Sequence, residues 1–248
     1  MIRPHERPPR IWPVFLATLI GFAILMTLGA WQVKRLAWKE ALLAQLSANA
    51  AAEPVDLSMA YNMSRAGSNV EFVRVKFTGT YKNAPPMKML SGYQGGQGWT
   101  IIAPAASDDG WAVIVDRGRL PGQRLDSYTL LEGPQEIEGV IRTHPSGQGY
   151  FDPVNDPASG MWYWWDVQGM VAASGLAPDL NPFPFAVQLV PTANGVEFPA
   201  PQEAKADLAN NHLGYAITWF GLALTLLGVS GFYIFDLRRR RREWQAGR

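Results

Sequence analysis

Two long segments without a charged residue constrain the fold of this 248-residue chain more than any other feature. They occupy residues 11–33 and 213–235, and each has 23 residues. About 20 apolar residues in a helix span the roughly 30 Å hydrocarbon core of a bilayer. We therefore expect a membrane protein in which transmembrane helices at 11–33 and 213–235 flank an extracytoplasmic domain at 54–209.

A cleaved signal peptide is the alternative interpretation of the first apolar segment. Such a peptide has a basic start, an apolar region of about 7–15 residues and a small-residue cleavage site. The apolar run here is longer, and the sequence LGAWQVKR at its end places the bulky Trp31 and Gln32 after the small pair. We therefore expect this segment to be retained as an anchor.

The distribution of basic residues predicts the orientation of both helices. Residues 1–10 contain three Arg and one Glu, and residues 236–248 contain six Arg, one Asp and one Glu. Residues 36–209 carry 11 basic and 18 acidic residues. Because Lys and Arg near the ends of a span stay on the cytoplasmic side, both tails should be cytoplasmic and the central domain periplasmic, in a cell inner membrane. The arginine run at 238–242 is interpreted as an orientation signal and not as a nucleic-acid site.

The region between the apolar segments has the pattern of a mostly antiparallel β (α+β) domain. The first helix should continue outward to about residue 52, because strong helix formers precede Pro54. A short helix is predicted at 164–175, with Asp166 as its cap and Gly175 at its end. Turn signals separate the short apolar runs, which favours an antiparallel sheet or partial barrel. The predicted strands are 70–81, 87–91, 98–105, 111–118, 135–142 and 184–190.

No residue constellation typical of an enzyme is present in the sequence. The chain lacks the H-E-x-x-H, Walker and G-x-S-x-G motifs, and it has no cysteine. Its three histidines, His5, His144 and His212, are far apart in the sequence. We therefore do not expect an enzyme, and we expect His144 to be a surface residue. An enzyme with an outer active site and an anchored sensor remain weaker alternatives.

The outer ends of the two apolar segments carry the most informative polar residues. His212, Tyr215 and Trp219 have i, i+3, i+7 spacing, which places them on one helical face. A neutral imidazole can ligate haem iron, and aromatic rings can flank a porphyrin. The alternative is that Trp and Tyr are enriched at membrane interfaces without any ligand, and the spacing alone favours that alternative. The first segment reaches the same level of the membrane at Trp31, Gln32 and Arg35.

Two motifs resemble those of a known family. LGAWQVKRLAWK, at residues 28–39, resembles the Leu-Gly-x-Trp-Gln-x-x-Arg-x-x-Trp-Lys signature of the surfeit-locus assembly factors of cytochrome c oxidase. HLGYAITW, at residues 212–219, is similar to the second-span motif of that family. VDRGRLP is a looser match, because Asp116 and Arg119 replace the Asn and Trp of the family pattern. WYWWDV resembles the Trp-containing run of the family that closes on Asp166. The resemblance covers the whole chain.

The resemblance implies a membrane protein that binds haem a at the outer membrane face and aids its insertion into oxidase subunit I. It implies that His212 ligates the haem iron and that Arg117 and Asp166 are structural. Further implied partners are haem A synthase, other oxidase assembly factors and membrane lipid. The alternative is a haem-free membrane scaffold that stabilises subunit I during biogenesis. The candidate cofactor-binding residues are His212, Tyr215, Trp219, Trp31, Gln32 and Arg35.

Overall fold

The structure is a computed structural model that divides into a helical unit and a β unit. The helical unit comprises Met1–Leu43 and Asp207–Arg248, and the β unit comprises Ala44–Ala206. Apart from Arg10, the predicted N-terminal tail at 1–10 lies outside the described residues. The structure describes residues 10–82, 87–93, 95–124, 131–144, 148–191, 199–202 and 210–246.

The two apolar segments form long helices, α1 (Trp12–Ala51) and α4 (His212–Ala246). Both are long and apolar enough to cross a membrane, by length and composition. The predicted continuation of the first helix to about residue 52 is confirmed. The second helix runs beyond 213–235 through the arginine run. Two i, i+4 ion pairs support this extension: Arg240 lies 2.8 Å from Asp236, and Arg239 lies 3.5 Å from Glu243.

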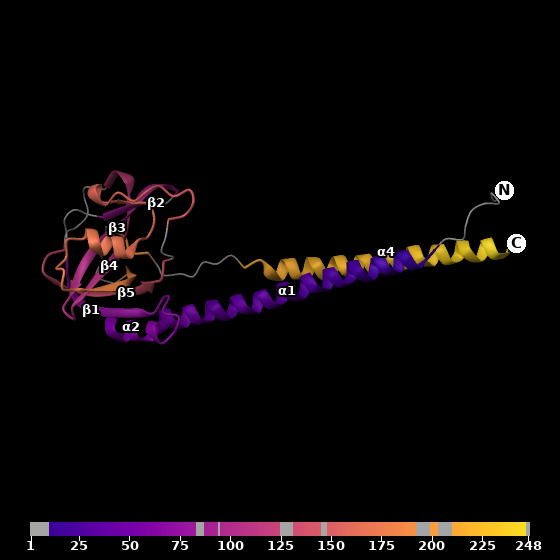
Figure 1. The fold of residues 1–248 in the computed structure, drawn as a ribbon, viewed down its shortest axis with the longest axis horizontal. Helices are drawn as coiled ribbons and strands as arrows, with labels where there is room; N and C mark the ends of the chain where they lie inside the picture. Colours follow the sequence, from indigo (N-terminus) through magenta and orange to yellow (C-terminus); the bar gives the residue numbers. More distant parts are fainter. Residues whose placement is uncertain are drawn as a thin grey trace. The chain divides into compact units, whose positions relative to one another are not determined.

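In the helical unit, α1 and α4 lie side by side and antiparallel (Figure 1). A Cβ at Gly21 would lie 3.1 Å from the Leu226 side chain, and a Cβ at Gly29 would lie 2.5 Å from the Phe220 ring. As the residue numbers of these contacts rise along α1, the numbers of their partners fall along α4, as in an antiparallel pair. The buried residues of α4 are spaced by seven and are mostly small, which lets the two helices approach closely. They are Ala216, Ala223, Ser230 and Leu237.

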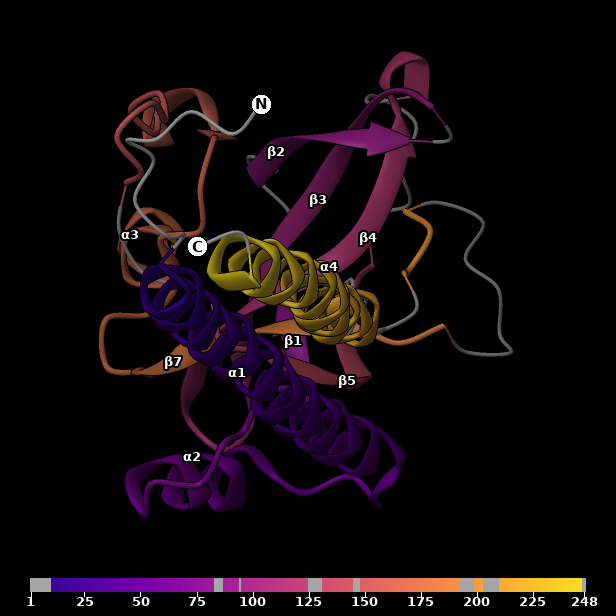
Figure 2. The same ribbon diagram turned by 90° about the vertical axis from the view of Figure 1, so that its right-hand side faces the viewer.

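The β unit is built on a closed ring of five strands. Figure 2 shows two of them, the long neighbouring strands β3 and β4. The ring runs β1–β5–β7–β4–β3 and closes because Gly79–Tyr81 of β1 also pair with Ala105–Ser107 of β3. β2 and the short β6 extend the sheet beyond the first half of β3. Only the β4–β7 and β2–β6 pairings are parallel among the described strands. The strands are β1 (Arg74–Tyr81), β2 (Met87–Tyr93), β3 (Gly96–Ser107), β4 (Trp111–Pro121), β5 (Pro134–Arg142), β6 (Met161–Trp162) and β7 (Asn181–Leu189).

The mostly antiparallel β domain predicted from the sequence is confirmed, with local corrections. The predicted strand 70–81 begins only at Arg74, because Phe72 adopts a left-handed φ of 61° and its N–H bonds Ile141 O instead of extending the strand. The predicted strand 184–190 corresponds to β7, which begins three residues earlier. The other four predicted strands lie within β2, β3, β4 and β5, apart from small differences at their ends.

Two helices cover the β unit, and one of them was not predicted. α2 (Leu57–Arg65) is capped by Asp56, whose carboxylate accepts the Met59 N–H at 2.6 Å. α3 (Val167–Ala173) is shorter than the predicted 164–175, but Asp166 caps it as expected. Its carboxylate accepts the Gly169 N–H at 2.9 Å.

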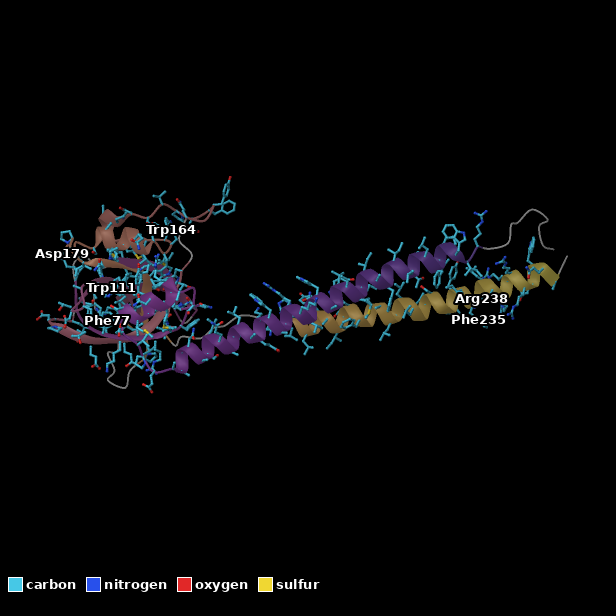
Figure 3. The ribbon with its side chains drawn as sticks, turned by 60° about the horizontal axis from the view of Figure 1, so that its bottom comes forward. Phe77, Trp111, Trp164, Asp179, Phe235 and Arg238 are labelled. Carbon is cyan, nitrogen blue, oxygen red and sulfur yellow. The ribbon has the colours of Figure 1, made fainter. Side chains whose placement is uncertain are left out.

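The core of the β unit follows from strand alternation. In β1, Val75, Phe77 and Tyr81 are buried, whereas Lys76 between them is exposed. The inward side chains of the ring form one apolar cluster with Leu57 of α2, and a second cluster around Trp162 and Met170 lies beneath α3. Phe77 and Trp111 lie within this domain, and Phe235 lies on α4 (Figure 3). Burial of large apolar side chains is therefore the main stabilising term of the β unit.

Candidate functional site at the helix pair

A direct hydrogen bond joins the two helices of the helical unit. Nδ1 of His212, the first residue of α4, lies 2.8 Å from Oε1 of Gln32 on α1. Gln32 is 9% exposed, so this amide is one of the few polar side chains that α1 buries. The structure thus brings together two residues that are 180 positions apart and that the sequence placed at the same membrane level.

Small residues next to this bond set how closely the helices approach. Gly29 lies one turn before Gln32, and the Phe220 ring occupies the space that a side chain at residue 29 would fill. Ala216, one turn after His212, is 3% exposed. Sequence reasoning missed the part played by Phe220 and Ala216. The seven-residue spacing of Ala216, Ala223 and Ser230 was the signal that could have indicated the contact face.

The other predicted site residues of α4 do not share one environment. Tyr215 is 57% exposed, whereas Trp219 is half-buried and Ala216 is buried. At about 100° per residue, position 219 lies only about 20° from position 212 around the helix, whereas position 215 lies about 60° away. Trp219 therefore shares the face of His212 more closely than Tyr215 does. The i, i+3, i+7 pattern did not show on which side α1 would lie.

The predicted residues of α1 also point in different directions. Trp31 is 56% exposed. The guanidinium carbon of Arg35 lies 4.0 Å from the centre of the Trp38 ring, in a cation–π contact. Only Gln32 among the three predicted residues of α1 is buried. The exposed Trp31 and Arg35 thus lie on the same helix as the buried Gln32, whose partner His212 is half-buried.

The motif residues of the β unit have structural environments, as the sequence indicated. Arg117 is 2% exposed, and its guanidinium lies 5.4 Å from the Tyr81 ring centre, where burial raises the pKa of Tyr81 to about 12. Asp116 accepts the Gly118 N–H at 2.9 Å. Gly118 has φ 114°, and a Cβ there would lie 2.3 Å from Ala200 O, so this position requires glycine.

The prediction that His144 is a surface residue is wrong. Its ring stacks on Trp165, with ring centres 4.2 Å apart and the ring planes 1° from parallel. The side chain is half-buried, and burial lowers the pKa of His144 to about 4. His144 therefore belongs to the packing of the β unit.

These features define a class of protein: two long apolar helices, linked by a histidine–glutamine bond, that flank a mostly antiparallel β domain. The SURF1 family profile matches residues 19–224, and the chain therefore belongs to the SURF1 family. This range includes both Gln32 and His212. The family resemblance noted from the motifs is thus confirmed.

Named relatives match along most of their length. The chain is 28% identical over 224 residues to a SURF1-like protein of Rickettsia bellii, covering 88% of this chain and 89% of that protein. It is 28% identical over 233 residues to Surfeit locus protein 1 of Homo sapiens, covering 86% of this chain and 73% of that protein. The corresponding protein of Takifugu rubripes is 28% identical over 216 residues, covering 79% and 86%.

Proposed function

We propose that the protein assists the assembly of haem–copper cytochrome c oxidase by binding haem a and aiding its insertion into oxidase subunit I. Membership of the SURF1 family supports the assembly role. The observation that carries the haem-binding part is the position of His212 at the first residue of α4, where it is bonded to Gln32. In this proposal both termini are cytoplasmic, and the domain at 54–209 is periplasmic, at the cell inner membrane.

The donor set at the helix pair fits haem better than a free metal ion. Among the described residues, no group of three or more His, Cys, Asp and Glu side chains is gathered. A haem needs only one or two axial ligands from the protein, because its ring supplies the other four. His212 offers one imidazole, and Trp219 on the same helix and Trp31 beside Gln32 offer aromatic surface.

In this role the residues of the chain bind and orient the cofactor. His212 would ligate the iron, and Arg35 carries a guanidinium of the kind that pairs with carboxylates such as haem propionates. Bound haem a supplies a redox-active iron and a long apolar tail. Tyr215 is exposed on the apolar helix and would contact such a tail or the surrounding lipid. Ligation by a single imidazole at the lipid boundary would bind the haem and still permit its transfer to subunit I.

A haem-free scaffold is the second candidate function, and the same hydrogen bond favours it. The Gln32–His212 bond and the contact between Gly29 and Phe220 join the helices without any cofactor. A stable helix pair would hold subunit I in a receptive state during biogenesis. Haem A synthase and other oxidase assembly factors are proposed partners in either role, together with membrane lipid. We propose no catalytic reaction for the protein.

The test is purification of the protein from cells that make haem A, followed by absorption spectroscopy. We expect a Soret band in the native protein, at least about ten-fold weaker per protein in His212→Ala because the axial ligand is lost. His144→Ala is the matched control and should keep the band. Subunit I that copurifies with a native protein lacking any Soret band would favour the scaffold.

A further inference from the structure

Gln32 has a feature that a simple helix-to-helix link does not need. Its amide oxygen faces one particular nitrogen of the His212 ring, Nδ1, at 2.8 Å. We propose that Gln32 is a positioning residue that fixes the tautomer and the ring orientation of His212, and so selects Nε2 as the nitrogen that ligates iron. This inference rests on the proposed haem-binding function.

The tautomer follows from the chemistry of the two groups. An amide oxygen accepts hydrogen bonds and cannot donate them. Nδ1 of His212 must therefore carry the hydrogen in this bond, with Gln32 Oε1 as its acceptor. A neutral imidazole has only one N–H, so Nε2 keeps its lone pair. The lone pair is the part of the ring that can bind a metal ion.

The orientation follows from the burial of Gln32. This side chain is 9% exposed on a helix whose neighbouring turn, at Gly29, lies against the Phe220 ring. The amide is therefore held by packing, and its acceptor atom occupies a fixed place beside the start of α4. The two nitrogens of an imidazole point in divergent directions, so a ring whose Nδ1 faces Gln32 turns Nε2 away from α1. Histidines that bind metals in proteins are oriented in the same way by an acceptor on the second nitrogen.

The choice of an amide over a carboxylate sets the strength of the ligand. A carboxylate that accepts from Nδ1–H increases the electron density on the imidazole and strengthens the bond from the other nitrogen to the metal. The neutral amide of Gln32 polarises the ring less. The pair therefore gives a correctly oriented but moderate ligand, which suits a protein that must transfer its cofactor to another protein.

Substitutions at Gln32 separate this role from a purely structural link. Gln32→Glu keeps an acceptor of the same length beside Nδ1 and adds charge. Gln32→Leu keeps the bulk and removes the acceptor. A structural link predicts that Gln32→Glu leaves the ligand properties of His212 unchanged, whereas the positioning role predicts that it strengthens them.

The first measurement uses the haem-free protein, so that it does not depend on haem binding. Nitrogen-15 NMR of the full chain with labelled histidine, at alkaline pH, distinguishes a protonated Nδ1 from a protonated Nε2. The chain has three histidines, and His212→Ala identifies the signal of interest. We expect hydrogen on Nδ1 in the native protein and a shift toward the Nε2–H form in Gln32→Leu. Hydrogen on Nε2 in the native protein, or an unchanged spectrum in Gln32→Leu, would overturn the inference.

The second measurement uses the haem-loaded protein. Gln32→Leu should weaken haem binding by about 10- to 100-fold, as the loss of such a second partner typically does. Gln32→Glu, unlike Gln32→Leu, should bind haem at least as tightly as the native protein does. It should also shift the iron reduction potential to a lower value. Gln45→Leu, an exposed position on the same helix, is the matched control and should change neither property.

The outcomes also separate this inference from the proposed function. Native protein that binds haem, with affinity and potential unchanged in both Gln32 variants, would overturn the positioning role and leave the function intact. Native protein without a Soret band would overturn the function together with the ligand role. The NMR spectrum of the haem-free chain would then still show whether Gln32 fixes the tautomer.

Discussion

The helical unit and the β unit bury opposite kinds of side chain. In the helix pair most of the buried residues are small or polar, such as Gly29, Gln32 and Ala216. Many large apolar residues of the same helices are exposed, and Phe232 of α4 is 77% exposed. In the β unit, Phe183 and Trp162 are at most 1% exposed. Charged residues such as Lys76 mostly lie outside, and Arg117 is a buried exception.

The difference is the one expected for a β unit in water and a helix pair associated with a membrane, an association that the two long apolar helices suggest. In water, removing apolar surface from solvent is the main force that holds a domain together. Between helices in lipid this force is absent, and close packing of small residues together with hydrogen bonds takes its place. A substitution should therefore have an effect set by the unit in which it lies, even when the residue type is the same.

Phenylalanine provides the strongest test of this contrast. Phe183 is fully buried in the ring of strands, so Phe183→Ala should lower the free energy of unfolding of the β unit by about 3–5 kcal/mol. Phe235 of α4 is 69% exposed, and Phe235→Ala should change stability by less than about 0.5 kcal/mol. Hydrogen exchange measured on separate peptides of β7 and α4 reports both effects in one protein. Equal effects at the two sites would show that the two units are stabilised in the same way.

Glycine provides the next test, within the helical unit. Gly29→Leu should force α1 and α4 apart, because its Cβ alone would lie 2.5 Å from the Phe220 ring. Overpacking of this kind typically costs about 1–3 kcal/mol. The chain has no cysteine, so cysteines introduced at the exposed Val33 and Leu213 can carry spin labels for a distance measurement. The measured distance should increase, and Phe220→Ala should restore it.

A matched control lies on the other helix. At Gly228 of α4 an added Cβ would meet nothing within 4 Å. Gly228→Leu should therefore leave the distance between the two labels unchanged. If it separated the helices as much as Gly29→Leu does, the contact face inferred for α4 would be wrong.

The sequence predicted those parts of the molecule that depend on local periodicity and on the length of apolar segments. The alternation at Val75 and Phe77 located β1, and the absence of charge located both long helices. The expected hairpin of two helices also placed Gln32 and His212 at the same level, where the structure shows a hydrogen bond between them. The strand and helix predictions succeeded because each uses a pattern that neighbouring residues carry.

The predictions that failed depend on partners distant in the sequence. The left-handed Phe72 that shortens β1 is bonded to Ile141, and no local signal indicates that contact. His144 was taken for a surface residue because its partner, Trp165, lies 21 positions along the chain. Similarly, helical spacing grouped Tyr215 with His212, but the position of α1 decides which of the α4 residues are buried.

His144 makes the stability of the β unit dependent on pH. Burial lowers its pKa to about 4, compared with about 6.5 in an unfolded chain. The native β unit therefore holds the ring neutral, and its stability falls as pH decreases from about 6.5 toward 4, because unfolding lets the ring take up a proton. His144→Phe keeps an aromatic ring beside Trp165. It should reduce the loss of stability between about pH 6.5 and 4 by about 1–3 kcal/mol. Denaturant unfolding across this pH range measures it, and an unchanged slope would contradict the burial of His144.

Asp116 should give a smaller response of the opposite sign. Burial raises the pKa of Asp116 to about 6, above the value of about 3.9 for an unfolded chain. Between these values the native state binds more protons than the unfolded state, so this group makes the β unit more stable as pH falls from about 6 to 4.

Asp116→Asn keeps an oxygen that can accept the Gly118 N–H and removes the charge. We expect it to stabilise the β unit at neutral pH by about 1–2 kcal/mol and to steepen the acid loss caused by His144, because the opposing response is gone. The same unfolding series tests this, and a variant less stable than the native protein at neutral pH would show that the ionised carboxylate has a favourable partner in the fold.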